Sequence, residues 1–372
     1  MNVGYDIRPL IFTKAGIATY LYNLIANLAR LSDGDIYLFS SSSSRIAWRQ
    51  KFQNVKEKVV RLPQLNRYFE SLWGEHLLPL AIKRGKIDVF HGPRFFVPQK
   101  LSCPSVVTVH DLGFKKFPEL VKSGVAAYFD EMVASSVKRA RKVIVLSHAT
   151  RKDLIDLYKV ADGKIAVIYC AADKAFSPVT DKAAIERVKL KFSIRKKFIL
   201  FAGTVEPRKN IVNLLEAYRM AKAKDEFDLV VAGGYGWLYD EVLRKASQPE
   251  LQSKVVFTDY ISSEDMACLY SGCEAFVFPS FYEGFGLPVL EAMNCGAPVI
   301  TSSTSSLKEL FADSSYQVDP HSPGSIAEGI DNVLSNAALR DELRTKGAKR
   351  SKDFSWEATA RQTLEAYKEA IS

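Results

Sequence analysis

Short apolar runs alternate with longer amphipathic stretches along almost the whole chain, and this alternation limits the possible folds more than any other feature. The apolar runs of the first half are Asn2–Ile7, Ile36–Ser40, Lys58–Leu62, Val89–His91, Val106–His110, Val143–Ser147 and Ile165–Tyr169. Those of the second half are Phe198–Ala202, Leu229–Ala232, Val255–Phe257, Ala275–Phe278, Pro298–Thr301 and Tyr316–Val318. Such runs are typical of strands buried on both faces of a parallel sheet.

The intervals between several of these runs have the periodicity of helices. Gly16–Leu31 carries Ile17, Tyr20, Leu21 and Leu24 on one helical face. The other helical stretches are Tyr128–Arg141, His148–Tyr158, Ile211–Ala223, Trp237–Ala246, Glu264–Tyr270, Leu287–Asn294, Ser305–Phe311 and Ser325–Ser335. Repeated βα units predict an α/β fold, and two sets of them predict two doubly wound, Rossmann-like domains.

The length of 372 residues also suits two domains. The expected join is Phe176–Asp181, where Pro178 favours extended chain before it. We therefore expect an N-terminal domain over 1–176, a C-terminal domain over 177–353 and a terminal segment over 354–372. Ligands of such sheets bind beyond the carboxyl ends of the strands, so we expect two facing domains with the active site in the cleft between them.

Composition excludes several other classes of protein. No run of 18 apolar residues is present, and the first residues lack the charged and apolar regions of a secretory signal. The five cysteines form no CxxC pair, which favours a reduced, cytoplasmic setting.

The positive charge is concentrated in the first half. Residues 1–175 carry 27 Lys and Arg against 15 Asp and Glu, a balance of +12, whereas the remainder has a balance of −3. A basic half could face anionic lipid, a phosphate-bearing acceptor or nucleic acid, or it could be only a lysine-rich solvated surface. Charge alone does not decide between these possibilities.

The most specific motif is the segment 279–293, which follows the run Ala275–Phe278. It contains Glu283-Gly-Phe285-Gly286-Leu287-Pro-Val-Leu-Glu291. Pro288 suits the first turn of a helix beginning near Leu287, and the free N–H groups of that helix could bind a phosphate. Glu291, one turn into the helix, could accept hydrogen bonds from a ribose diol, and Glu283 could reach a sugar hydroxyl. The alternative is that both glutamates merely decorate a surface helix.

A second motif, Gly203-Thr-Val-Glu-Pro-Arg208-Lys209-Asn210, follows the run Phe198–Ala202. The dipole of a helix disfavours cations at its start. Two cations at this position therefore indicate a bound anion such as a diphosphate, which a guanidinium can bind with two hydrogen bonds. The alternative is a solvated basic turn.

Two weaker signals lie in the first half. His110, with Asp111 beside it, closes the run Val106–His110, where a histidine could contact a ligand. Gly16 opens the first predicted helix after Lys14 and Ala15, so the backbone there could approach a phosphate. Each could instead be structural.

Other common signatures are absent from the sequence. There is no GxxxxGK[ST], HExxH or GxSxG, and Gly233–Gly236 lacks the spacing of a dinucleotide fingerprint. The only Asp-x-Asp is Asp33–Asp35, in a predicted surface turn. We therefore predict no essential metal and no cofactor other than a co-substrate.

These motifs together resemble those of the retaining glycosyltransferases with the two-domain GT-B fold. Glu283 to Glu291 resembles their E-x7-E motif, Gly203–Asn210 their diphosphate-binding turn, and His110-Asp111 their first-domain histidine. The segment starting Phe354-Ser-Trp356 resembles the final helix that crosses back to the first domain. The chain is thus similar to glycosyltransferase family 4. Asp6–Pro9, Thr108–Leu112 and Phe117–Glu119 point to its bacterial mannosyltransferase-like members, which build O-antigen and other surface polysaccharides.

The resemblance implies a role for each matching residue. Arg208 and Lys209 would bind the donor diphosphate, Glu291 the ribose, and Glu283 the transferred sugar. The other implied contacts are His110 on the sugar, backbone at Gly16, Gly203, Phe285, Gly286 and Leu287, and backbone at Tyr260 and Ile261 on the base. Family members often have two glycines in the first loop, whereas here Ala15 precedes Gly16.

The subgroup implies transfer of mannose from GDP-mannose to a glycan or lipid-linked glycan, with no nucleic acid partner. UDP-glucose and UDP-N-acetylglucosamine are the alternative donors. A sugar-nucleotide epimerase, a phosphorylase or a non-enzymatic two-lobed binding protein would represent other classes. We expect the protein to lie in the cytoplasm, peripherally on the inner face of the plasma membrane.

Overall fold

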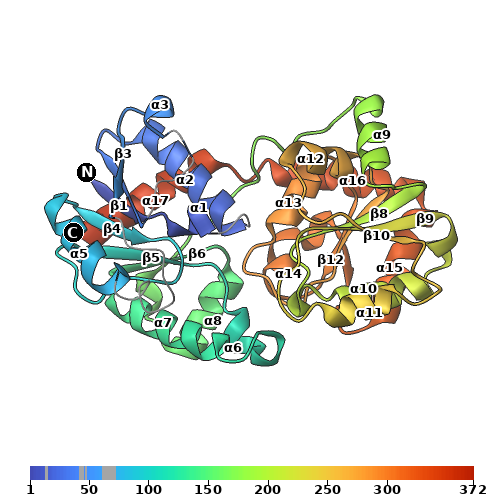
Figure 1. The fold of residues 1–372 in the computed structure, drawn as a ribbon, viewed down its shortest axis with the longest axis horizontal. Helices are drawn as coiled ribbons and strands as arrows, with labels where there is room; N and C mark the ends of the chain where they lie inside the picture. Colours follow the sequence, from blue (N-terminus) through green and yellow to red (C-terminus); the bar gives the residue numbers. More distant parts are fainter. Residues whose placement is uncertain (13–15, 42–45, 47, 61–72) are drawn as a thin grey trace. The chain divides into compact units, whose positions relative to one another are not determined.

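A computed structural model describes residues 1–12, 16–41, 46, 48–60 and 73–372. Contacts divide the chain into two units (Figure 1). Unit 1 consists of Met1–Leu112, Ala127–Cys170 and Ser355–Ser372, and unit 2 of Gly113–Ala126 and Ala171–Phe354. The short segment Gly113–Ala126 thus groups with unit 2 although it lies in the first half of the sequence.

Unit 1 contains a parallel sheet in the order β3-β2-β1-β4-β5-β6-β7. Its strands are β1 (Val3–Asp6), β2 (Ile36–Ser40), β3 (Val55–Val59), β4 (Val89–Gly92), β5 (Ser105–Val109), β6 (Lys142–Val145) and β7 (Ile165–Val167). The helices beside it include α1 (Arg8–Phe12), α2 (Gly16–Leu31), α3 (Trp48–Lys51), α5 (Leu78–Arg84), α7 (Val125–Arg139), α8 (His148–Tyr158) and α17 (Trp356–Ile371). Helix α17, from the far end of the sequence, packs on α2.

Unit 2 contains a second parallel sheet, in the order β10-β9-β8-β11-β12-β13. Its strands are β8 (Lys197–Ala202), β9 (Phe227–Ala232), β10 (Val255–Phe257), β11 (Ala275–Phe278), β12 (Val299–Ser302) and β13 (Tyr316–Val318). Its helices include α6 (Gly113–Lys116), α9 (Lys182–Lys191), α10 (Ile211–Met220), α11 (Asp240–Ala246), α12 (Ser263–Gly272), α13 (Leu287–Asn294), α14 (Ser305–Phe311), α15 (Pro323–Ser335) and α16 (Ala337–Ser351).

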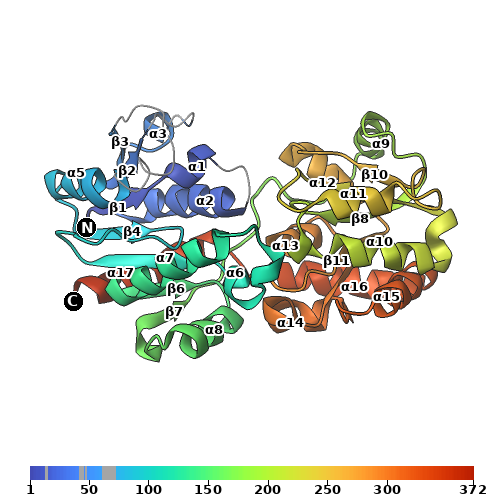
Figure 2. The ribbon, with the colours of Figure 1, turned by 60° about the horizontal axis from the view of Figure 1, so that its bottom comes forward.

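The order of the strands places a switch point in each sheet. In each unit the chain forms one half of the sheet, returns to the middle and then forms the other half, so that β1 lies beside β4 and β8 beside β11. Helices flank both faces of each sheet (Figure 2), as the nearly continuous apolar strands require. Chain segments that leave neighbouring strands in opposite directions leave room for a ligand at this point.

One strand prediction was wrong at its start, because β3, Val55–Val59, begins three residues before the predicted run Lys58–Leu62. Arg61 and Leu62 lie outside the described residues, and the two valines of β3 are separated by Lys56, Glu57 and Lys58. β3 lies at the edge of its sheet and pairs only with β2, so it needs only one buried face. An apolar run is therefore a poor guide to such a strand.

Candidate active site

The switch point of unit 2 brings together the two motifs that follow β8 and β11. Ile199 and Leu200 of β8 are paired with Ala275 and Phe276 of β11. The segments after these two strands therefore emerge side by side at the carboxyl edge of the sheet.

The segment after β8 is a tight turn tied to its neighbour. Gly203 has φ +150, a conformation that favours glycine, and the 3₁₀ turn Pro207–Lys209 ends at Asn210 with φ +61. The amide of Asn210 donates to the carbonyl oxygens of Pro279 (2.9 Å) and Pro320 (2.6 Å). These bonds fix the turn against the segments that follow β11 and β13.

Four charged side chains form an ion cluster at this edge. Lys209 Nζ lies 2.6 Å from Glu283 Oε1, and Arg208 Nη1 lies 3.1 Å from Glu283 Oε2. Arg208 also contacts Glu206 Oε1 at 2.9 Å. Lys209, Glu206 and Glu283 are buried, so this is not a solvated basic turn. The two cations are neutralised by two carboxylates.

The ion cluster keeps Glu283 ionised. Burial raises the pKa of this carboxyl group, but Lys209 and Arg208 outweigh burial and leave the pKa below its ordinary value. A buried carboxylate with two cationic partners can exchange one of them for a sugar hydroxyl without losing its charge.

Helix α13 begins where the sequence predicts, directly after Gly286. Gly286 has φ +107, and a Cβ there would lie 2.6 Å from Leu307 Cδ2, so the backbone requires glycine. Pro288 lies in the first turn of the helix. The first N–H groups of a helix have no partner within it, so this turn can bind an anion.

The loop before α13 is held by two serines of α14. Ser305 Oγ accepts from the N–H of Glu283, and Ser306 Oγ donates to the carbonyl oxygens of Glu283 (2.8 Å) and Phe285 (3.1 Å). The ring of Phe285 is buried against Phe311 and Phe354. The backbone of Phe285, and not its ring, is therefore suited to contact a ligand.

Glu291 lies one turn into α13, and Tyr270 of α12 donates a 3.2 Å hydrogen bond to its carboxylate. Burial raises the pKa of Glu291 to about 7; the Tyr270 bond lowers it and the charge of Asp173 raises it. Glu291 therefore changes its charge near neutral pH, unlike Glu283.

Tyr260 and Ile261 follow β10, and Tyr260 is 62% exposed. The loop after β9 also lies against the turn after β8, because Val205 and Tyr235 form a parallel bridge and Val205 N donates to Gly234 O at 2.9 Å. A Cβ on Gly233 would lie 2.1 Å from Gly203 O. Gly233 thus allows the two turns to pack closely.

In unit 1, His110 follows β5 and is buried with a fixed orientation. Its Nε2 is 2.7 Å from the carbonyl oxygen of Pro93, which can only accept, so Nε2 carries the proton. Burial lowers the pKa of His110 to about 4; the Pro93 bond and Asp111 raise it and Arg94 lowers it. The ring is therefore neutral at pH 7, with Nδ1 as its hydrogen-bond acceptor.

Gly16, the remaining predicted contact, is the first residue of α2 and is exposed. The preceding Lys14 and Ala15 lie outside the described residues.

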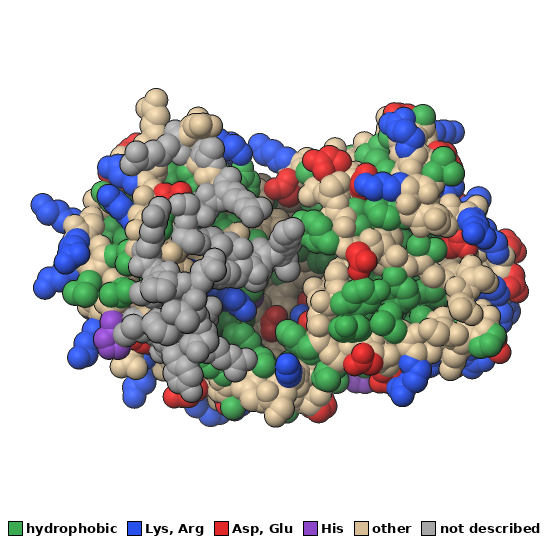
Figure 3. Space-filling view, viewed as in Figure 1, with side chains coloured by type: hydrophobic (Ala, Val, Ile, Leu, Met, Phe, Trp, Pro, Cys, Tyr) green, Lys and Arg blue, Asp and Glu red, His purple; other side chains and the backbone are tan. Residues whose placement is uncertain are grey.

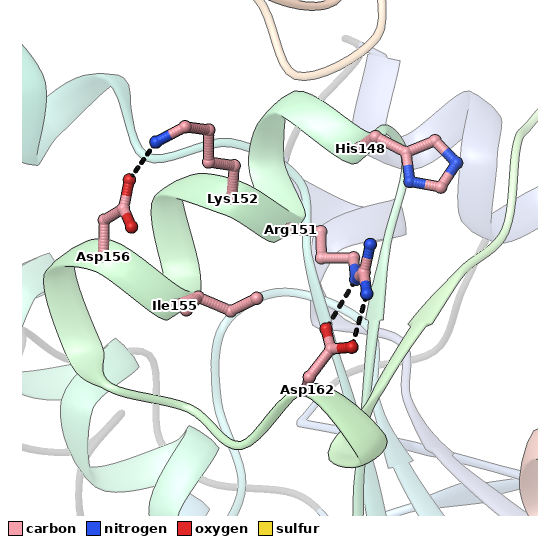
Figure 4. A pocket seen from close by; sticks show the side chains of 6 residues that line it. All are labelled: His148, Arg151, Lys152, Ile155, Asp156 and Asp162. Carbon is pink, nitrogen blue, oxygen red and sulfur yellow. Dashed lines mark hydrogen bonds and ion pairs between the residues drawn. The ribbon is translucent and has the colours of Figure 1, made fainter.

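A further hollow of about 370 Å³ lies on α8 and contains none of the predicted site residues (Figure 4). Its walls are formed by His148, Arg151, Lys152, Ile155, Asp156 and Asp162. Arg151 pairs with Asp162 at 2.5 Å, and Lys152 pairs with Asp156. These cations are thus already neutralised by neighbouring carboxylates.

Within the described ranges, no three His, Cys, Asp or Glu residues are grouped so that they could hold a metal ion. Over the same residues, no helix is both long and apolar enough to cross a membrane.

The sequence reasoning missed several residues of this region. Glu206 lies inside the second motif but was given no role, and Tyr270, Ser305 and Ser306 lie in other elements. Glu206 could have been found as the acidic residue beside two cations. The other three have no local signal, since only the fold brings them to the glutamates.

Comparisons with known proteins agree with this architecture. A family model described as "Glycosyl transferases group 1" matches residues 183–350, and one described as "Glycosyltransferase Family 4" matches residues 15–176. The structure of sucrose-phosphate synthase from Thermosynechococcus elongatus aligns with a TM-score of 0.77 at 22% identity, covering 99% of this chain and 98% of that one. The two parallel-sheet units thus have the GT-B fold, as predicted.

Curated relatives establish the family. The chain is 31% identical to "O-antigen chain mannosyltransferase B" of Escherichia coli over 381 residues, covering 99% of this chain and 100% of the relative. It is 32% identical over 350 residues to "Serotype-specific mannosyltransferase WbdA" of Escherichia coli, covering 91% of this chain but only 42% of that protein. The chain belongs to glycosyltransferase family 4, a family of retaining enzymes, and is a hexosyltransferase.

Proposed function

We propose that this enzyme transfers mannose from GDP-mannose, with retention, onto a glycan or lipid-linked glycan during surface polysaccharide synthesis. The observation that carries the proposal is the end-to-end similarity to a protein named as an O-antigen chain mannosyltransferase, at 31% identity. The buried ion cluster after β8 and β11 supports a donor that contains a diphosphate.

In this proposal the donor lies along the carboxyl edge of the sheet of unit 2. Arg208 and Lys209 bind the diphosphate together with the first turn of α13, and Glu291 binds the ribose. Glu283 gives up part of its contact with the two cations and binds hydroxyl groups of the sugar. The backbone contacts are proposed at Gly16, Gly203, Phe285, Gly286, Leu287, Tyr260 and Ile261.

His110 of unit 1 is proposed to bind the transferred sugar. With the proton on Nε2 directed at Pro93, a neutral ring can accept a hydrogen bond from a sugar hydroxyl through Nδ1. His110 cannot act as a general acid near pH 7, because its pKa is lowered to about 4. Burial is the main cause of this lowering.

The proposed chemistry is a loose displacement at the anomeric carbon. The bond from this carbon to the diphosphate oxygen breaks, and a bond to the acceptor oxygen forms on the same face. The acceptor proton moves to the departing diphosphate, whose charge Arg208, Lys209 and α13 stabilise. Glu283 is bound to two cations, which suits electrostatic support better than nucleophilic attack.

Donor choice can be measured by thermal shift. We expect GDP-mannose to raise the unfolding midpoint more than UDP-glucose, UDP-N-acetylglucosamine or ADP-glucose does, because a ligand of the folded state stabilises it by mass action. A ligand at about 100 times its Kd adds about 2.7 kcal/mol. A larger rise in the midpoint with a UDP sugar would identify that sugar nucleotide as the donor instead. Epimerisation of the donor without an acceptor would contradict glycosyl transfer.

Membrane attachment through unit 1 is a separate proposal. The expected location is the cytoplasm, at the inner face of the plasma membrane. Lys and Arg side chains project at the margin of unit 1 on the face shown in Figure 3, and the three stretches of unit 1 carry 25 Lys and Arg against 16 Asp and Glu, a balance of +9. We expect sedimentation with vesicles containing anionic phosphatidylglycerol at low salt, and release at about 0.5 M salt because screening shortens the range of the attraction. Equal binding to neutral phosphatidylcholine vesicles would contradict an electrostatic contact.

A further inference from the structure

A chain of hydrogen bonds crosses the core of unit 1 and includes the C-terminal helix. Tyr5 of β1 bonds to the hydroxyl of Tyr367 in α17, and that hydroxyl lies 2.6 Å from His91 Nδ1. His91 Nε2 lies 2.7 Å from Thr108 Oγ1, which lies 3.3 Å from the hydroxyl of Tyr20. All five side chains are at most 1% exposed. We call them the polar chain.

The last member of the polar chain packs directly on His110. The rings of Tyr20 and His110 lie edge to face, with centroids 5.0 Å apart at 89°. The ring of Phe95 also lies edge to face with the ring of His110, with centroids 6.0 Å apart. Thr108 holds both of these neighbours, because its carbonyl oxygen accepts from the N–H of Phe95 at 3.1 Å and its Oγ1 bonds to Tyr20.

Helix α17 contacts this arrangement at two places. Near its start, the ring of Trp356 lies 5.8 Å from that of Tyr20. Three turns later, Tyr367 bonds to both Tyr5 and His91. Between them, Thr359 donates to the carbonyl oxygen of Tyr169 at 2.7 Å, which ties the helix to the segment after β7.

A buried polar chain of this kind has few alternative arrangements. Removal of one partner leaves another buried group without its hydrogen bond, which is unfavourable. Burial, and then the charge of His110, lower the pKa of His91 to about 3, so both imidazoles are neutral at pH 7. The polar chain therefore works through fixed neutral donors and acceptors, which suits it to holding a ring in place.

We propose that Tyr367, His91, Thr108 and Tyr20 are positioning residues for His110, so that the C-terminal helix helps to orient the histidine that binds the transferred sugar. This inference rests on the proposed role of His110. The alternative is that the polar chain only satisfies buried groups and stabilises unit 1.

Nuclear magnetic resonance of the full chain with ¹⁵N-labelled histidine separates these possibilities without any activity assay. The His110 ring signals, assigned by their loss in His110→Gln, should show the proton on Nε2. Tyr367→Phe and Thr108→Val should shift or broaden those signals. Tyr158→Phe is the matched control, because it removes a tyrosine hydroxyl bonded to Asp130 (2.7 Å), outside the polar chain. Unchanged His110 signals in both variants would overturn the proposal.

A double-mutant cycle gives the functional test. We expect Thr108→Val to lower kcat by about 10- to 100-fold, as for small misplacements of a binding group, and to have no further effect in a His110→Ala background. If the effects of Thr108→Val and His110→Ala on kcat multiply fully in the double variant, the role of Thr108 is structural and the proposal is overturned. If Thr108→Val does not fold, Tyr20→Phe keeps the ring and removes only the hydroxyl. Absence of transfer by the wild type would instead reject the proposed function, while the ring signals would still test positioning.

Discussion

Lys209→Met is expected to lower both donor affinity and stability. The change removes a cation 2.6 Å from the buried Glu283, and loss of one partner of a buried pair costs about 3–5 kcal/mol. For a unit of this size that corresponds to a fall of about 10 °C in the midpoint of thermal unfolding. Donor affinity should fall about 10- to 100-fold through loss of a charge-assisted bond to the diphosphate. Calorimetric titration with GDP-mannose measures the second effect.

The double variant Lys209→Met with Glu283→Gln separates the two effects. It removes the carboxylate that has lost one of its two cations, so the unfolding midpoint should recover most of its loss, whereas donor affinity should stay low. Lys245→Met is the control, because its pair with Glu216 (2.7 Å) is less buried than the pair of Lys209 with Glu283. Recovery of donor affinity in the double variant would contradict diphosphate binding by Lys209.

Glu291→Gln is expected to weaken donor binding and to stabilise the protein above pH 7. Burial raises the pKa of Glu291 from an ordinary 4.5 to about 7. The folded state therefore keeps a proton that the unfolded state loses, so the contribution of Glu291 to stability falls as pH rises from about 4.5 to about 7. The total fall is about 3 kcal/mol. Glutamine does not titrate, so the midpoint of the variant should exceed that of the wild type at pH 8 and match it near pH 4.5.

The affinity for the donor should depend on pH in the opposite direction to the stability. A ribose diol donates to the ionised carboxylate, so wild-type affinity for GDP-mannose should rise between pH 6 and pH 8, and the variant should lose this rise. Glu342→Gln is the control, since its carboxylate is exposed and paired with Lys346. A pH-independent wild-type affinity would contradict ribose binding by Glu291.

The sequence predicted the fold well because buried parallel strands carry a strong local pattern. Helix α13 begins at Leu287 as predicted, since Gly286 and Pro288 both mark a helix start. Helices α9 and α16 went unpredicted because they are largely polar. Among the residues of α9 only Val188 is buried, and in α16 only Leu343, Gly347 and Ser351 are. Such helices have no apolar stripe for periodicity to detect.

The candidate site could be predicted only in part. Arg208, Lys209 and Glu283 were predicted from two motifs that lie 74 residues apart, and the sheet brings them into contact. The pairing of Glu283 with both cations could not be predicted, because pairing between distant segments depends on side-chain geometry. The surroundings of His110 were equally hidden, since Pro93 and Tyr20 reach it from separate elements.

The assembly of unit 1 from three separate stretches of sequence has a consequence for synthesis on the ribosome. Tyr367 is fully buried in the core of unit 1, yet it is translated after the first two stretches of that unit and after a long intervening stretch. The remainder of unit 2, Ala171–Phe354, is made before this helix. Contacts between distant residues form slowly, and domains usually fold in the order of their synthesis. Unit 1 is thus begun before Ala171–Phe354 is made and completed after it, so its core stays incomplete until this helix has been made.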